Sequence, residues 1–153
     1  YEGLPEATAK AKLAGDDGRV WHRMGDLGFL DAQGRLWFCG RMGHRVETGS
    51  ARLLSAVEAV FGEHPRVARC ALVGVGPRGA QRPVLVVEPR REAWPRGRAA
   101  RDAFAKELLA LGAANPRTST IRDVLFHRAL PVDVRHNAKI RRELLATWAM
   151  TRV

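Results

Sequence analysis

Residues 67–75 read Val-Ala-Arg-Cys-Ala-Leu-Val-Gly-Val, a run whose aliphatic and β-branched side chains predict a buried strand. A second strand is predicted from Pro83 to Val87, after a loop of glycine, proline and arginine at residues 76–82. A third strand is predicted at residues 121–127. These three runs indicate a small mixed sheet on which helices pack.

Three segments around these strands have the apolar spacing of amphipathic helices. The first, residues 55–64, begins with Ser55-x-x-Glu58, which has the form of a capping box. The second covers residues 99–111 and the third covers residues 139–149. We expect the inward face of the third helix to consist of Ile140, Leu144, Leu145 and Trp148.

Two further strand-like runs lie upstream, at residues 19–31 and 35–39, and residues 31–34 between them predict a hairpin turn. Several glycines then fall between residues 40 and 49, and glycine is favoured wherever the backbone changes direction. We therefore predict three parts, which are residues 1–41, a hinge at residues 42–44, and residues 45–153.

The formal net charge is +10, from 26 Lys and Arg against 16 Asp and Glu. Such an excess is typical of proteins that bind nucleic acid or an acidic partner. However, the arginines are spread along the chain, and neither a zinc-finger spacing nor a stripe of interleaved aromatic and basic residues accompanies them. We therefore expect no nucleic-acid function, and a basic binding module for nucleic acid or an acidic partner stays an alternative.

Cys39 and Cys70 lie in apolar runs and predict two buried thiols in a reducing compartment, which for this chain is the cytoplasm. The histidines lack metal-ligand spacing, so we expect no metal site. The longest apolar runs, such as residues 84–87, are too short to span a bilayer. Because the chain opens on Tyr1 without an initiator Met or a signal pattern, we expect that Tyr1 is not the natural first residue of the protein.

Two glycine-flanked residues in the first part are candidates for binding a nucleotide. Asp26 follows Gly25 at a predicted strand bend, where its two carboxylate oxygens can accept both vicinal hydroxyls of a ribose. Arg41 follows Gly40 and can bind ribose or phosphate oxygens with its guanidinium group. Taken singly, Asp26 is more often an ordinary turn residue and Arg41 more often an ordinary surface residue.

Lys139 opens the last predicted helix, and Arg141 and Arg142 occupy its first turn. The helix dipole disfavours cations at that end by roughly 0.3–1 kcal/mol each. Because no structural reason for three cations is visible in the sequence, their presence indicates a functional role. The alternative is that all three side chains are solvated and contribute nothing.

The order of these motifs resembles the adenylate-forming superfamily, which includes acyl-CoA synthetases, luciferases and peptide-synthetase adenylation domains. The resemblance is carried by Met-Gly-Asp at residues 24–26, Asp-x-x-Gly-Arg-Leu-x-Phe-x-Gly-Arg at residues 31–41, the glycine-rich hinge, and a lysine about a hundred residues later. It covers nearly the whole chain and implies an α/β (α+β) lid domain, with a sheet of about three strands flanked by helices. A β-hairpin remnant of a larger N-terminal domain would precede it.

The resemblance implies roles for particular residues, each at a position that matches a family motif. Asp26, Arg41 and Arg52 would bind ATP or AMP, Lys139 would be the catalytic lysine, and Met42-Gly43 would be the hinge. Gly49, His136 and Asn137 would support the site. Mg²⁺ would accompany ATP in the full-length enzyme, whose phosphate loop lies upstream, so the chain alone is expected to be inactive and to hold no cofactor.

Some positions depart from the usual superfamily pattern, which has Thr where Met24 stands and Ser/Thr-Gly before the late lysine where this chain has Asn-Ala. These variants resemble the olefin β-lactone synthetases, which convert a long-chain β-hydroxy acid to a β-lactone. That resemblance implies thiolase-like and decarboxylase partners in bacterial olefin biosynthesis. A fatty acyl-CoA ligase is the alternative within the superfamily, and a CoA requirement would decide for it.

Overall fold

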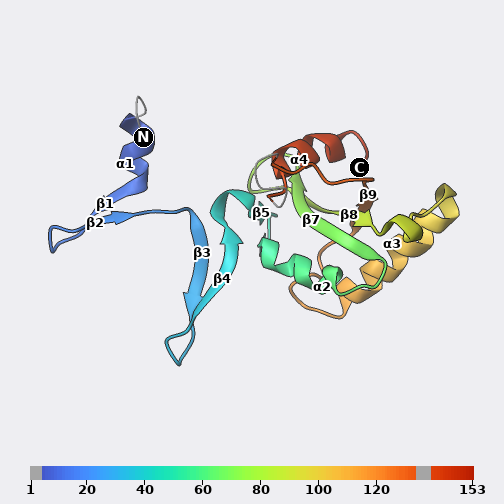
Figure 1. The fold of residues 1–153 in the computed structure, drawn as a ribbon, viewed down its shortest axis with the longest axis horizontal. Coiled ribbons are helices and arrows are strands. Elements are labelled where there is room, and N and C mark those ends of the chain that lie inside the picture. Colours follow the sequence, from blue (N-terminus) through green and yellow to red (C-terminus); the bar gives the residue numbers. More distant parts are fainter. Residues whose placement is uncertain (1–4, 134–138) are drawn as a thin grey trace. The chain divides into compact units, whose positions relative to one another are not determined.

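The computed structural model describes residues 5–133 and 139–153 (Figure 1). The chain forms two compact units, Tyr1–Gly43 and His44–Val153. The second unit contains nearly all of the buried apolar side chains. We therefore describe the second unit first, because its packing explains the fold.

The centre of the second unit is a three-stranded sheet with the order β7-β8-β9. The strands are β7 (Val67–Val75), β8 (Arg82–Pro89) and β9 (Asp123–Phe126). β7 and β8 are antiparallel, whereas β8 and β9 are parallel. A parallel pair needs a crossover connection, and α3 (Gly97–Ala113) provides it. The small mixed sheet predicted from the sequence is confirmed.

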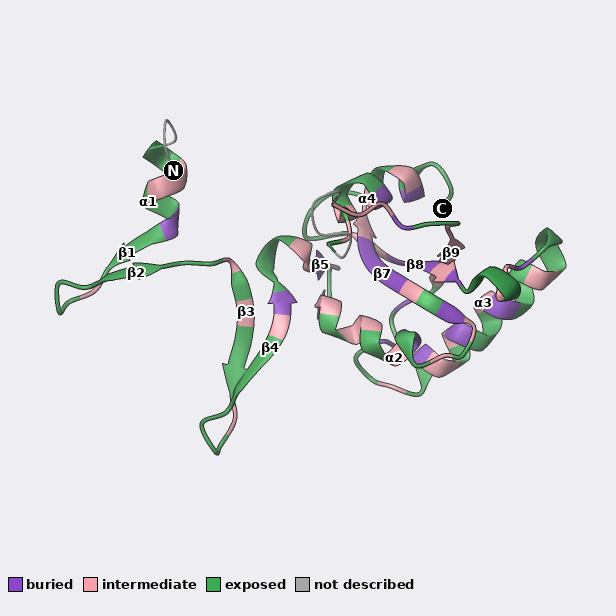
Figure 2. Ribbon diagram, viewed as in Figure 1, coloured by how far each residue is buried: buried purple, intermediate pink, exposed green. Residues whose placement is uncertain are grey.

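The side chains of β7 and β8 alternate between two apolar clusters, one on each face of the sheet. Figure 2 shows that much of both strands is buried. Leu72 and Leu85 face the cluster that α2 (Glu58–Gly62) and α3 cover with Phe61, Phe104 and Leu108. Val73 and Val84 face the opposite cluster, which α4 (Arg142–Met150) covers with Leu145 and Ala149. Both strands read as continuous apolar runs because they are buried on both faces.

Gly112 allows α3 to approach α2 closely. A Cβ atom at this position would lie 2.9 Å from Cε1 of Phe61, well inside van der Waals contact. We expect Gly112→Val to lower the free energy of unfolding by about 1–3 kcal/mol, because overpacking forces the ring or the helix to move. Gly62→Val is the matched control, since a Cβ there meets nothing within 4 Å. Equal losses in urea unfolding of the two variants would contradict this reading.

The capping box predicted at Ser55 and Glu58 is wrong. A 3-10 turn, η2 (Ser55–Val57), precedes α2, and neither helix start has a side-chain cap. The Glu58 carboxylate instead accepts the backbone N–H of Leu72 at 2.8 Å and bonds from Nη2 of Arg142 at 2.6 and 2.7 Å. Burial raises the pKa of Glu58, and the Arg142 charge opposes that shift. Glu58 is therefore a core residue that joins β7 to α4.

The last helix also begins later than the sequence pattern predicts. Ile140 forms an isolated β-bridge with Val132, which keeps the chain extended there, and α4 begins only at Arg142. Leu145 and Ala149, four residues apart, form the buried stripe of this helix. Leu144 was predicted to face inward, but its exposed fraction is 46%.

The first unit consists of short elements. They are α1 (Pro5–Ala11), β1 (Lys12–Ala14), β2 (Val20–His22), β3 (Asp26–Leu30) and β4 (Leu36–Arg41). β1 pairs with β2, and β3 pairs with β4, both antiparallel. The hairpin at residues 31–34 is confirmed, with Gly34 at φ +75°. The single strand predicted at residues 19–31 is wrong, because Gly25 at φ +75° divides it.

Two-residue strands β5 (Val46–Glu47) and β6 (Arg52–Leu53) open the second unit, after the 3-10 turn η1 (Met42–His44), and η3 (Arg91–Ala93) precedes α3.

Cys70 is buried as predicted, and burial raises the pKa of its thiol to about 12. Cys39 is only partly buried, so the expectation of two buried thiols is wrong for it. Over residues 5–133 and 139–153, no helix has the length and apolar character needed to cross a membrane.

Candidate functional site

Asp26 and Arg41 lie side by side in the β3–β4 hairpin. They face each other in the strand register, and Nε of Arg41 lies 3.1 Å from Oδ1 of Asp26. Nη1 of Arg41 also donates a hydrogen bond to the carbonyl oxygen of Met24 at 2.7 Å. The N–H of Met42 donates to the carbonyl oxygen of Gly25 at 2.8 Å. These bonds fix the two candidate side chains to both ends of the glycine bend.

Both side chains of this pair remain accessible to a ligand. The exposed fraction is 34% for Asp26 and 47% for Arg41. A carboxylate has about four acceptor positions, so one bond from Arg41 leaves Asp26 able to accept further donors. The guanidinium group likewise has five donor hydrogens, of which these contacts use two. The pair can therefore bind a group that offers both hydroxyl donors and anionic acceptors.

Gly49 and Arg52 lie in or beside the turn between β5 and β6. Oγ1 of Thr48 accepts the N–H of Ala51 at 2.8 Å and donates to its carbonyl oxygen at 3.1 Å, which closes the turn. A cavity of about 540 Å³ lies over this turn and is lined in part by Arg52 and Gly79. The turn does not require glycine at position 49, because a Cβ there would meet nothing within 4 Å.

Glu47 is a residue of this cavity that the sequence patterns do not reveal. Its carboxylate lies 2.5 Å from Nη2 of Arg45 and 3.3 Å from Nε of Arg78. Its backbone N–H donates to Oε1 of Gln81 at 2.9 Å. Because Arg78 is far away in sequence, no local pattern predicts that these charges meet. The cluster holds the β5–β6 turn against the loop between β7 and β8.

Lys139 is exposed and lies three residues before α4, so it does not open the helix as predicted. Its carbonyl oxygen accepts the N–H of Asp133 at 2.9 Å. The argument from the helix dipole therefore does not apply to Lys139, and Arg142 has a structural partner in Glu58. His136 and Asn137, the predicted supporting residues, lie outside the described residues.

The predicted site residues thus fall into two sets. Asp26 and Arg41 belong to the first unit, whereas Gly49, Arg52 and Lys139 belong to the second. Met42 and Gly43 end the first unit, and their role as a hinge stays a prediction. Within the part of the chain that the structure describes, no three His, Cys, Asp or Glu side chains gather so as to hold a metal ion.

No protein-family model matches the chain. The chain is, however, 52% identical over 97% of its length to the olefin β-lactone synthetase of Xanthomonas campestris pv. campestris. It spans only 27% of that relative. The chain therefore corresponds to a minor part of that relative's length.

Solved structures give the same result for the fold. An amide bond synthetase, McbA from Marinactinospora thermotolerans, matches 97% of this chain with a TM-score of 0.74 and 30% identity. The ATP-bound RpMatB–BxBclM chimera B1 matches 98% of it with a TM-score of 0.77 and 25% identity. The chain covers 28% of each of these two structures.

Proposed function

We propose that the chain is part of a longer enzyme that activates a carboxylic acid with ATP. The reason is that the chain belongs to the adenylate-forming superfamily and corresponds to its carboxy-terminal portion. The substrate that we propose is a long-chain β-hydroxy acid, and the product is a β-lactone. The identity of 52% to an olefin β-lactone synthetase supports this choice over other carboxylic acids.

The Asp26–Arg41 pair is the observation that carries the proposal. Asp26 has two acceptor oxygens, which suit the two vicinal hydroxyls of a ribose. Arg41 holds the carboxylate from one side at 3.1 Å and offers further donors to the sugar or the α-phosphate. A ribose of ATP would therefore bind at the open side of the glycine bend, with little rearrangement of the pair.

Lys139 would act on the reacting groups. Its exposed ammonium group can stabilise the negative charge that develops between the substrate carboxylate and the α-phosphate. In the first step, a carboxylate oxygen bonds to the α-phosphorus and pyrophosphate leaves. In the second, the β-hydroxyl oxygen attacks the acyl carbon and closes the ring, its proton passes to water, and AMP leaves. The nucleophile belongs to the same molecule, so proximity favours ring closure over attack by a second substrate.

The two units would move relative to each other between these steps, with Met42-Gly43 as the hinge. Lys139 belongs to the second unit and Asp26 to the first, so the movement would bring the lysine to the nucleotide for the first step and withdraw it afterwards. Mg²⁺, when bound with ATP, would neutralise phosphate charge.

We expect Asp26→Ala in the full-length protein to weaken ATP binding by about 10–100-fold, because two hydrogen bonds to a charged acceptor are lost. Equilibrium binding of ATP measures this effect. Asp17→Ala is the matched control, since Asp17 also pairs with an arginine, Arg19, at 3.4 Å, but in a different turn of the same unit. An unchanged ATP affinity in Asp26→Ala would refute the ribose role.

The function is tested by incubating the full-length protein with ATP, Mg²⁺ and a long-chain β-hydroxy acid, with and without CoA, and identifying the products by mass spectrometry. A β-lactone and AMP formed without CoA are the expected products. An acyl-CoA thioester would instead favour the fatty acyl-CoA ligase. If no AMP is released, the alternative function, a basic binding module for nucleic acid or an acidic partner, would be favoured. Thiolase-like and decarboxylase partners, which would supply the acid and consume the lactone, are part of the same proposal.

A further inference from the structure

The two edges of the three-stranded sheet differ. At the β7 edge, the N–H of Leu72 points away from β8 and donates to the Glu58 carboxylate. At the β9 edge, the N–H of His127 donates inward to Val87 at 2.8 Å, so by strand alternation the backbone groups of Val124 and Phe126 point outward. The sheet order ends at β9 among the described strands, so these outward groups lack a strand partner.

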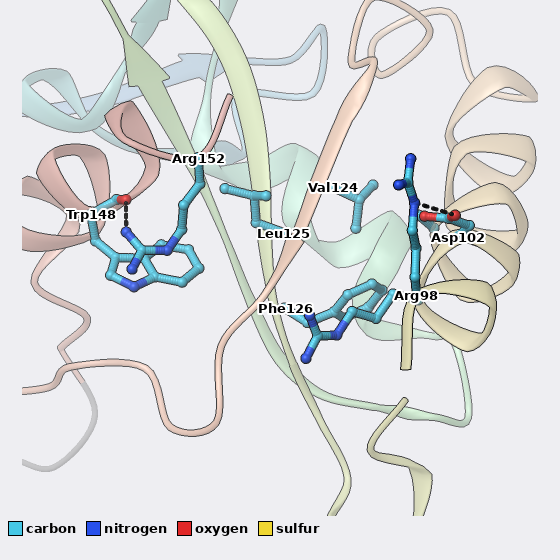
Figure 3. Close-up of a pocket in the computed structure, with 9 residues that line it drawn as sticks. Arg98, Asp102, Val124, Leu125, Phe126, Trp148 and Arg152 are labelled. Atoms are coloured by element: carbon cyan, nitrogen blue, oxygen red, sulfur yellow. Dashed lines mark hydrogen bonds and ion pairs between the residues drawn. The ribbon is translucent and has the colours of Figure 1, made fainter. Parts of the chain in front are cut away.

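A cavity of about 640 Å³ lies along this open edge. Figure 3 shows Val124 and Leu125 of β9 between side chains of α3 and of α4. Val124 packs against one apolar cluster of the sheet and Leu125 against the other, so the cavity spans the edge and not one face. Phe126 and Trp148 extend its apolar lining. An extended chain lying there would contact both faces alternately, as a fourth strand does.

The walls of this cavity are basic. Arg98 and Arg101 line it from α3, and Arg152 lines it from the end of α4, against the single acidic residue Asp102. Arg98 lies 3.7 Å from Asp102, and both side chains are largely exposed. Arg101 has no hydrogen bond or ion pair to any residue that the structure describes. The cavity therefore presents uncompensated positive charge beside unpaired strand groups.

We propose that the open edge of β9 binds an extended, acidic segment of a partner protein by strand addition. The outward N–H and C=O groups of Val124 and Phe126 would pair with the backbone of the segment. Its alternate side chains would face the apolar lining, and its carboxylates would meet Arg98, Arg101 and Arg152. This binding is independent of the proposed enzymatic function, because none of the residues that line the cavity is proposed to bind the nucleotide or to act on the carboxylate.

The aromatic side chains near the cavity favour a peptide over a nucleic acid. Arg152 covers the ring of Trp148, which lines the cavity, at 4.5 Å. The ring of His127 meets Trp148 edge-on at 4.8 Å. Single-stranded nucleic acids bind through bases that stack on open aromatic faces. Because Arg152 already covers a face of Trp148, a base could stack on that face only by displacing the arginine.

The test uses the 153-residue chain and a fluorescein-labelled peptide of alternating glutamate and valine, with binding followed by fluorescence anisotropy. We expect saturable binding that weakens about tenfold or more in Arg101→Glu, because the new charge repels the peptide. Arg117→Glu is the matched control, since Arg117 is an exposed residue beyond the other end of α3 and does not line the cavity. It should bind nearly as the wild type does.

Val124→Pro separates strand addition from attraction by charge alone. Proline removes the outward N–H of an edge strand, a position where folds tolerate it. We expect a loss of about tenfold or more in peptide affinity at a temperature where the variant is folded. A peptide N-methylated at alternate residues should bind the wild-type chain with a similar loss of affinity. This test remains valid even if Val124→Pro unfolds. Four results would each overturn the proposal. They are no binding of the peptide, equal losses of affinity in Arg101→Glu and Arg117→Glu, equal affinity for the N-methylated and unmethylated peptides, and tighter binding of single-stranded DNA than of the peptide.

Discussion

Replacing Lys139 by alanine in the full-length protein should lower the rate of acyl-adenylate formation by about 10²–10³-fold, the typical effect of removing one preorganised charge from a transition state. The substitution should leave stability unchanged, because Lys139 is exposed and the β-bridge beside it joins Val132 and Ile140. Pyrophosphate exchange measures the adenylation step directly, and thermal unfolding checks the fold.

Lys106→Ala is the control for Lys139, since Lys106 is an exposed lysine of α3 that takes no part in the proposed chemistry. Asp26→Ala provides a second comparison. It should weaken ATP binding, whereas Lys139→Ala should lower the rate at saturating ATP. Wild-type pyrophosphate exchange in Lys139→Ala would remove this lysine from the mechanism.

The Glu58–Arg142 pair should give the largest effects on stability. Both side chains are mostly buried, with exposed fractions of 15% and 14%. Removing one member of such a pair typically costs about 3–5 kcal/mol. We expect Glu58→Leu to approach this value, because it leaves the Arg142 guanidinium buried without its counter-ion and leaves the N–H of Leu72 unpaired. Urea unfolding of the 153-residue chain measures the loss.

Arg142→Leu should cost less, because the remaining Glu58 can take up a proton whereas arginine cannot lose one. Burial already raises the pKa of Glu58 above its usual 4.5, and removing Arg142 raises it further. A raised folded-state pKa gives stability that is fully present below 4.5 and is lost as the pH rises through the folded-state value. The variant should therefore be closer to the wild type in acid than at neutral pH.

The double variant, Glu58→Leu with Arg142→Leu, should be more stable than Glu58→Leu alone, because neither a charge nor its partner is left buried. Strictly additive losses would show that the two side chains do not act as a pair. The wild-type energy of the pair is then read from the double-mutant cycle and not from either single variant.

The sequence predicts the sheet of the second unit well because its strands are continuous apolar runs bounded by loops. It predicts helix starts less well, since those depend on distant contacts. Glu58 satisfies the local rule for a capping box, but its carboxylate is used by Arg142, which lies 84 residues away. Ile140 has a helical spacing, yet a bridge to Val132 keeps it extended.

The candidate site shows the same limit. Asp26 and Arg41 are identified from glycine-flanked motifs, but their pairing depends on the hairpin register, including a bulge between Leu27 and Gly28 that sequence alone does not reveal. The charges around Glu47 come from two separate segments, residues 45–47 and the loop that contains Arg78, so no local pattern contains them. For Lys139, the motif spacing predicts a catalytic role, which stays a prediction, while the helical setting inferred for it is wrong.

The closed edge of β7 has a consequence for self-association. Edge strands with free backbone groups are templates on which identical chains add in succession, as in amyloid fibrils. Glu58 occupies the Leu72 N–H in the middle of β7, so a second molecule cannot add a strand there without first breaking a buried ion pair. Two molecules joined at their β9 edges would leave only the β7 edges of this sheet exposed, where Glu58 already accepts the Leu72 N–H.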